Sequence, residues 1–223
     1  MRRSTKHLLV SAVIIFGLIT STHATTIGFG SVTDPTGDNA SGTPDITSAS
    51  VTIDSAGTAL FAITYASGTS LGAAAGSFAL DTDKNPATGS PGVDTGNNDS
   101  ALMGSDYALT MDGSSFSGKA IIYKYVSGSF SLVDTISVTY LGTTEEVLVP
   151  LSDLGGTSGA MNFVAESQTE ISLGTYTGIG DYAPNLNLTP GTVTLYGAPE
   201  VSSTLTLLGC ALLGLAALRR RLS

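Results

Sequence analysis

The central part of this 223-residue chain lacks the side chains on which most enzymes depend. The two histidines, His7 and His23, and the single cysteine, Cys210, all lie near the ends of the chain, and there is no tryptophan. A Ser-His-Asp or Cys-His catalytic unit is therefore excluded between residues 25 and 198, and so is a zinc site built from histidine or cysteine. Without cysteine, this part also cannot form an internal disulfide.

Basic residues are equally scarce in the central part. Residues 25–198 carry 17 acidic residues against three lysines and no arginine, which gives a formal charge of −14. Such a surface repels nucleic acid, so we expect no nucleic-acid partner. Catalysis would have to rely on a pair of carboxylates, and any acidic chain supplies such pairs by chance. We therefore predict that the protein is not an enzyme but a binding module or a structural protein.

The N-terminus has the pattern of an export signal. Three basic residues precede an apolar run from Leu8 to Ile19, and the small residues Thr22 and Ala24 occupy the positions that signal peptidase reads. We predict a signal peptide over residues 1–24, cleaved by signal peptidase after Ala24. The alternative is an uncleaved anchor, for which the apolar run is short.

The C-terminus predicts a membrane-spanning helix. Residues 201–218 are apolar apart from a few hydroxyls and would be about 27 Å long as a helix, close to the thickness of a hydrocarbon core. Arg219, Arg220 and Arg221 follow at once. Basic residues at this position place the end of the chain in the cytoplasm and the acidic central part outside.

Residues 198–223 resemble the PEP-CTERM sorting signal of Gram-negative bacteria that produce exopolysaccharide. The resemblance rests on Pro199 and Glu200, the hydroxyl residues after them, the short glycine-containing apolar stretch and the terminal arginines. It implies processing by an exosortase, removal of the tail and delivery to the cell surface or extracellular matrix. The alternative is a simple inner-membrane anchor, which the hydropathy supports equally well.

Residues 25–197 have the pattern of one all-β domain. Short apolar and β-branched runs alternate with turn residues, and no stretch shows an extended helical period. We expect a single antiparallel β-sandwich of jelly-roll type, flanked by the signal helix and the transmembrane helix. The expected strands are 47–53, 58–66, 77–81, 107–111, 119–126, 130–133, 135–140, 146–150, 161–167 and 192–196, and residues 150–155 are expected to form one helical turn.

Acidic side chains gather between Leu80 and Ala108. Asp81, Asp83 and Asn85 alternate, so an extended backbone would aim their oxygens to one side. Calcium binds such oxygens, and Asp106 and the loop residues Asp94, Asn97, Asn98 and Asp99 could complete the site. The alternative is a solvated turn in which the side chains bond backbone amides. A second cluster, Asp34 and Asp38 with Asp45 after it, is a further candidate for calcium.

Several segments together resemble the β-sandwich of family-nine carbohydrate-binding modules and DOMON-like domains. They include DPTGD at 34–38, LDTDKNPATG at 80–89 and GDYAPN at 180–185. The resemblance implies structural calcium at Asp81, Asp83, Asn85 and Asp106 and, in some members, a sugar site between aromatic rings. Since the chain has no tryptophan, the loop tyrosines Tyr107, Tyr176 and Tyr182 are the candidates for sugar binding. The strand tyrosines Tyr65, Tyr123, Tyr125 and Tyr140 are expected to pack against neighbouring strands.

These observations predict an exported, exosortase-sorted surface or matrix protein. Its non-catalytic, calcium-stabilised sandwich would bind or organise extracellular polysaccharide. The alternative is a structural envelope or biofilm-matrix protein without specific sugar binding, held by a simple C-terminal membrane anchor. Exposed tyrosines grouped on one concave face would favour the first hypothesis, whereas an open strand edge would favour the second.

Overall fold

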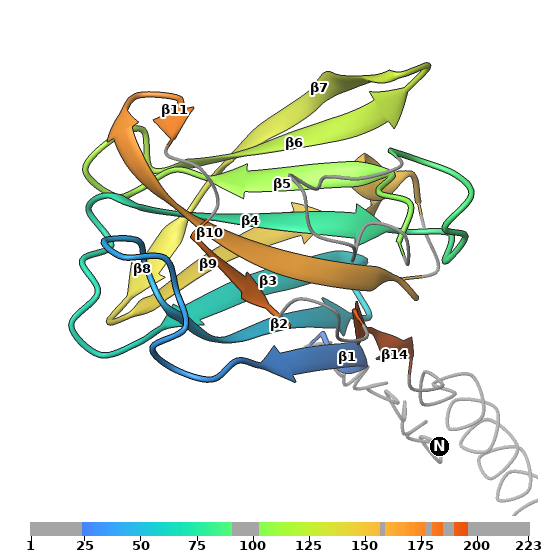
Figure 1. Cartoon of the computed structure of the whole chain (residues 1–223). Helices are drawn as coiled ribbons and strands as arrows, with labels where there is room; N and C mark the ends of the chain where they lie inside the picture. The colour runs from blue at the N-terminus through green and yellow to red at the C-terminus, as the bar shows by residue number, and fades with distance from the viewer. Residues whose placement is uncertain (1–23, 91–102, 157–158, 177–179, 185–189, 196–223) are drawn as a thin grey trace, which may run out of the picture.

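The computed structural model describes residues 24–90, 103–156, 159–176, 180–184 and 190–195. Nearly all of these residues form or connect antiparallel strands, as the sequence predicts (Figure 1). Among the described residues, no helix is both long enough and apolar enough to cross a membrane. The predicted signal helix and transmembrane helix lie outside the described residues.

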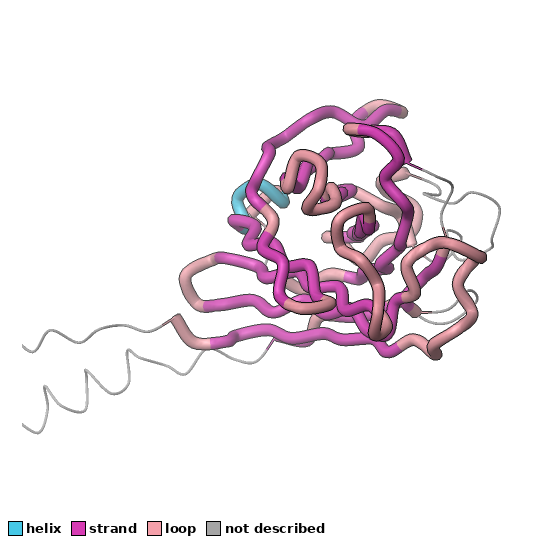
Figure 2. The backbone as a smooth tube through the Cα atoms, turned by 90° about the vertical axis from the view of Figure 1, so that its left-hand side faces the viewer, coloured by secondary structure: helices cyan, strands magenta, loops and turns pink. Residues whose placement is uncertain are grey.

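The strands form two antiparallel sheets. The first has the order β14 (Thr194–Leu195), β1 (Thr26–Thr33), β2 (Ile46–Asp54), β3 (Thr58–Tyr65), β9 (Thr144–Pro150) and β8 (Thr139–Leu141). The second has the order β11 (Thr175–Tyr176), β10 (Asn162–Ser172), β4 (Ala74–Asp81), β5 (Tyr107–Met111), β6 (Lys119–Val126) and β7 (Ser129–Ser137), and β12 (Asp181–Ala183) and β13 (Gly191–Thr192) also pair with β10. Figure 2 shows the two layers facing each other. The fold is therefore the predicted β-sandwich.

Alternating apolar side chains fill the space between the sheets. Every second residue of β3 is buried, and β2 and β9 follow the same rule over most of their length. The ring of Phe78 on β4 lies 5.2 Å from that of Phe61 on β3 and 6.1 Å from that of Phe163 on β10. The Phe61–Phe78 contact connects the two sheets, and the Phe78–Phe163 contact extends it along the second sheet.

Most expected strands occur within a few residues of the predicted bounds, and the helical turn is confirmed. It is the 3-10 helix η2 (Leu151–Leu154), which ends on Gly155 in the left-handed conformation. The expected strands 130–133 and 135–140 are divided differently: β7 runs unbroken through Asp134, and the chain passes to β8 after Ser137. Three strands, β1, β11 and β12, were not predicted.

Candidate cation sites and ligand cleft

Three carboxylates meet where the chain passes from β1 to β2. Asp34 follows β1, Asp38 lies in the next loop, and Asp181 reaches them from β12. One oxygen of each lies within 4.8 Å of the other two, and we call this group the Asp34 cluster. Asp34 and Asp181 are buried, with exposed fractions of 7% and 5%. Two of the three residues are predicted ligands; Asp181 was missed, although its segment 180–185 contributes to the family resemblance.

Hydrogen bonds and burial define the electrostatics of the Asp34 cluster. Asp181 accepts a hydrogen bond from the Ile46 N–H at 2.6 Å. Asp45, beside the cluster, accepts one from the Gly37 N–H at 2.9 Å through Oδ2, while its Oδ1 is buried without a hydrogen-bond partner. Burial, reinforced by the charges of Asp38 and Asp45, raises the pKa of Asp181 to about 6, against the opposing effect of its backbone hydrogen bonds. A cation would relieve this accumulation of negative charge.

A second group of carboxylates, the Asp81 cluster, lies after β4. One oxygen each of Asp81, Asp83 and Asp106 falls within 4.8 Å of the others. Asp81 is fully buried, and burial is the main cause that raises its pKa. Asp106 accepts hydrogen bonds at 2.9 Å from both the N–H and the hydroxyl of Thr82. Three of the four ligands expected here are therefore brought together.

Asn85 contacts the Asp81 cluster through its backbone N–H, whereas the sequence predicted a contact through its side-chain oxygen. The backbone does not stay extended, because Lys84 has a positive φ of 56° and turns the chain. The Asn85 N–H consequently donates to Asp81 at 3.1 Å and to Asp83 at 2.8 Å, and its side-chain oxygen accepts a bond from the Ala87 N–H. Asn85 thus contributes a backbone donor to the carboxylates, as in the alternative of a turn held by Asp and Asn side chains.

The two clusters lie at opposite ends of the sandwich. Along β10, Asn162 pairs with Asp81, whereas Ser167 pairs with Asp181. Five residues of extended strand correspond to about 16 Å. The predicted calcium ligands therefore belong to two separate clusters, and the additional candidates Asp94, Asn97, Asn98 and Asp99 lie outside the described residues.

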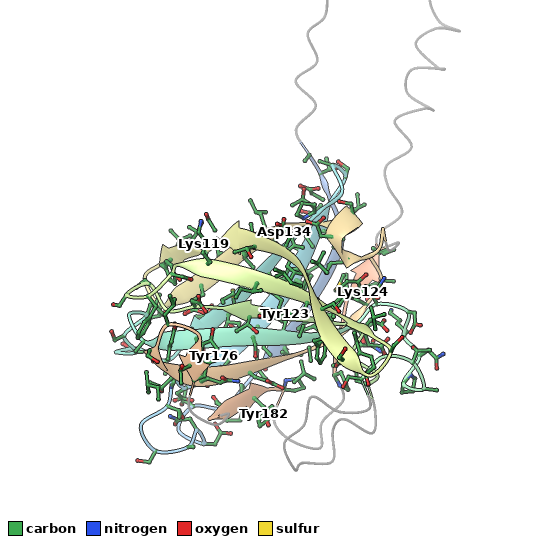
Figure 3. The ribbon with its side chains drawn as sticks, turned by 90° about the horizontal axis from the view of Figure 1, so that it is seen from above. Lys119, Tyr123, Lys124, Asp134, Tyr176 and Tyr182 are labelled. Atoms are coloured by element: carbon green, nitrogen blue, oxygen red, sulfur yellow. The ribbon has the colours of Figure 1, made fainter. Side chains whose placement is uncertain are left out.

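The tyrosines predicted to bind sugar do not share a face. Tyr107 is only 3% exposed and pairs with Leu80 at the end of the sandwich that carries the Asp81 cluster. Tyr176 lies at the other end, where it pairs with Glu170 and its hydroxyl donates to Asp112. Tyr182 lies on β12, and Figure 3 shows it on the same side as Tyr176, away from Lys124, which lies over the Tyr107 ring. A clamp made of these three rings is therefore not formed.

One of these tyrosines nevertheless lines a cleft. The cleft has a volume of about 330 Å³ and lies beside the Asp81 cluster. Its walls are Thr82, Asp83, Asp106, Tyr107, Lys124, Tyr125, Leu154 and Gly155. The Lys124 ammonium group lies 5.6 Å from the centre of the Tyr107 ring, within the range of a cation–π contact. The sequence reasoning missed Lys124 and Tyr125, because both occupy ordinary strand positions.

The comparisons with known proteins concern the end of the chain. Residues 199–222 match the model of the VPDSG-CTERM motif, a PEP-CTERM-like exosortase sorting signal. The match includes Pro199, Glu200 and the three terminal arginines. No curated protein and no solved structure matches the chain. The motif indicates an exported surface protein that is processed by exosortase-type machinery, as the sequence predicts.

Proposed function

We propose that the protein is a non-catalytic, calcium-stabilised module that binds extracellular polysaccharide at the surface or in the matrix of a Gram-negative bacterium. The main observation in support of ligand binding is the cleft beside the Asp81 cluster. Its size lies within the range of small-ligand sites, and it combines apolar and charged walls. The sorting motif supports the location. In this proposal signal peptidase cleaves after Ala24, and the exosortase removes the C-terminal sorting signal.

The walls of the cleft suit a sugar chain. The carboxylates of Asp83 and Asp106 can accept hydrogen bonds from sugar hydroxyls, and the Lys124 ammonium group can donate them. Tyr125, which is partly exposed, offers ring surface to the apolar face of a sugar, whereas the buried Tyr107 supports the cleft from below. A polar rim with one accessible tyrosine offers several weak contacts, which suits binding to a repeating polymer.

Calcium would support the cleft because Asp83 and Asp106 belong to both the cleft and the Asp81 cluster. An ion held by these oxygens would neutralise the carboxylates and fix the cleft wall. The Asp34 cluster would hold a second ion at the other end of the sandwich. Two observations support this second site: Asp34 and Asp181 are buried, and the buried Oδ1 of Asp45 has no hydrogen-bond partner.

The test is binding of the mature protein to purified exopolysaccharide, with the variants Lys124→Ala and Lys119→Ala compared. Both changes remove one positive charge from β6, but only Lys124 lines the cleft. We expect Lys124→Ala to weaken binding about tenfold, equivalent to about 1.4 kcal/mol, because a charged hydrogen-bond donor is lost. Co-sedimentation at fixed ionic strength measures the difference.

Lys119→Ala serves as the matched control and should bind like the unmodified protein. Equal weakening in both variants would mean that the polysaccharide responds to overall charge and not to the cleft. No binding by the unmodified protein, in either calcium or a chelator, would contradict the proposed function.

A further inference from the structure

β7 is an edge strand with an unusual amount of exposed apolar surface. It pairs with β6 on one side, and no strand within the described part of the chain pairs with its other side. Leu132 is 64% exposed, and Phe130 and Val133 are 39% and 40% exposed. In Figure 1, β7 forms the upper rim of the molecule. Such an edge presents unpaired backbone groups and apolar side chains to another chain.

Charge also distinguishes the β6–β7 hairpin, residues 119–137. No acidic residue occurs between Asp112 and Asp134, and two of the three lysines of residues 25–198, Lys119 and Lys124, lie on β6. The rest of this highly acidic part of the chain makes two copies repel each other. The hairpin is therefore the surface through which two copies can approach with the least repulsion.

Asp134 and Lys124 are placed so that two copies can complement each other. Asp134 pairs with Ile122, two residues before Lys124, so both side chains project from the same face of the hairpin. When two β7 strands pair antiparallel, residues 134–137 of one copy lie beside residues 129–132 of the other copy. Residues 129–132 pair with the part of β6 that contains Lys124. Each copy then brings a carboxylate toward a lysine of the other.

We propose that two copies of the chain associate edge to edge through β7, in a two-fold antiparallel pairing that continues the β4–β5–β6–β7 sheet. Phe130 and Leu132 lose exposed surface in this arrangement. The register shift opposite Ile122 and Tyr123 leaves Val133 as a bulge, which limits the regular pairing to a short stretch. We therefore expect a weak dimer, with a dissociation constant of about 10 μM or above, as for small interfaces.

This inference does not rest on polysaccharide binding, but Lys124 belongs both to the proposed cleft and to the proposed dimer contact, so the dimer is tested in the absence of polysaccharide. Confinement to a cell surface raises the local concentration of the copies, so weak pairing is sufficient to connect them. The pairing would supply the structural role that the sequence left as the alternative hypothesis.

The test is sedimentation velocity of the mature protein between about 1 μM and about 1 mM, a range that brackets the expected dissociation constant. We expect a shift from monomer to dimer, and we expect Leu132→Lys to remain monomeric over the whole range. Leu148→Lys is the matched control, because Leu148 is 58% exposed on β9 and lies outside the hairpin. Equal melting temperatures of the two variants establish that both fold.

A second variant pair tests the proposed orientation. Asp134→Lys should weaken the dimer at least threefold, and the double change Asp134→Lys with Lys124→Asp should restore it, because the charges are exchanged across the two-fold axis. A monomer at every concentration would overturn the proposal, and so would a dimer that Leu132→Lys leaves intact. If instead Leu132→Lys abolishes polysaccharide binding by a monomeric protein, the edge binds sugar and not a second copy.

Discussion

Glu145 places a carboxyl group inside the sandwich at a position where the strand pattern favours an apolar side chain. It precedes Val147 and Val149 on the inner face of β9 and is fully buried. Its Oε2 accepts a hydrogen bond from the Tyr65 hydroxyl at 3.1 Å, while Oε1 is buried without a hydrogen-bond partner. Burial above all, and then the charges of Asp112 and Glu170, hold the pKa of Glu145 well above its ordinary value. Glu145 is therefore a neutral acid in the folded protein over a range of pH in which the unfolded chain is ionised.

This raised pKa predicts that stability falls as pH rises. Above the ordinary glutamate pKa the folded state binds more protons at Glu145 than the unfolded state, so the free energy of unfolding decreases until the raised pKa is passed. Relative to Glu145→Gln, which does not titrate, the decrease is about 1.4 kcal/mol per pH unit within that window. Urea unfolding at several pH values measures it. Glu146→Gln removes a carboxyl group from the outer face of the same strand and should keep the pH dependence of the unmodified protein.

The Asp81 cluster could be predicted from the sequence because its residues border a single acidic segment, residues 80–108. The alternation of Asp81 and Asp83 predicted a shared oxygen cluster; one oxygen of each lies within 4.8 Å of the other, although the backbone turns at Lys84 and does not stay extended. Asp181 could not be connected to Asp34 in this way, because Ile46, whose amide fixes the carboxylate, is 135 residues away. The buried position of Glu145 was not predicted, because a carboxyl group on the inner face of a strand departs from the apolar alternation.

Among the elements, β1 is a strand whose glycines make it difficult to predict from the sequence. Gly28 and Gly30 face inward, and in a sequence they favour a turn. The structure explains Gly30 by close packing: a Cβ atom there would lie 2.5 Å from the carbonyl oxygen of Thr192. Glycine at this position permits the segment between β13 and β14 to lie against the sheet.

We expect Gly30→Ala to destabilise the protein by about 2 kcal/mol, as is typical when a side chain is forced into a packed site. For a domain of this size, that corresponds to a decrease of about 4–8 °C in melting temperature. Differential scanning calorimetry measures the change. Ser31→Ala alters the next, exposed residue of β1 and should leave the melting temperature within about 1 °C, since surface substitutions cost little. A Gly30→Ala protein as stable as the Ser31→Ala control would show that the β13–β14 segment does not need this close approach.

Strands that show a clear apolar pattern along the sequence were predicted well. The bounds of β5 and β6 match the expected ranges. Failures occur where pairing is long-range. β11 and β12 have two and three residues and exist because each pairs with β10, a contact that no local pattern encodes. The expected strands 130–133 and 135–140 left Asp134 out, but an exposed edge strand accepts a charged side chain at this position.

For the molecule as a whole, the dominant feature is negative charge without basic compensation. Residues 25–198 have a formal charge of −14, and two carboxylate clusters concentrate part of it at opposite ends of the sandwich. Such self-repulsion destabilises a compact state, and bound divalent cations would offset it. We therefore expect the stability of the chain to depend on surrounding ions more than that of a protein of balanced charge does.

Calcium should accordingly raise the melting temperature of the mature protein. A ligand at about 100 times its dissociation constant stabilises the folded state by about 2.7 kcal/mol per site, which corresponds to about 5–10 °C for a domain of this size. Asp38→Asn and Asp83→Asn, one in each cluster, should each remove part of this rise. Asp153→Asn, which belongs to neither cluster, should preserve it. A rise that is equal in all three variants and is reproduced by sodium chloride of the same ionic strength would indicate general screening, because only bound ions distinguish the carboxylates that coordinate them.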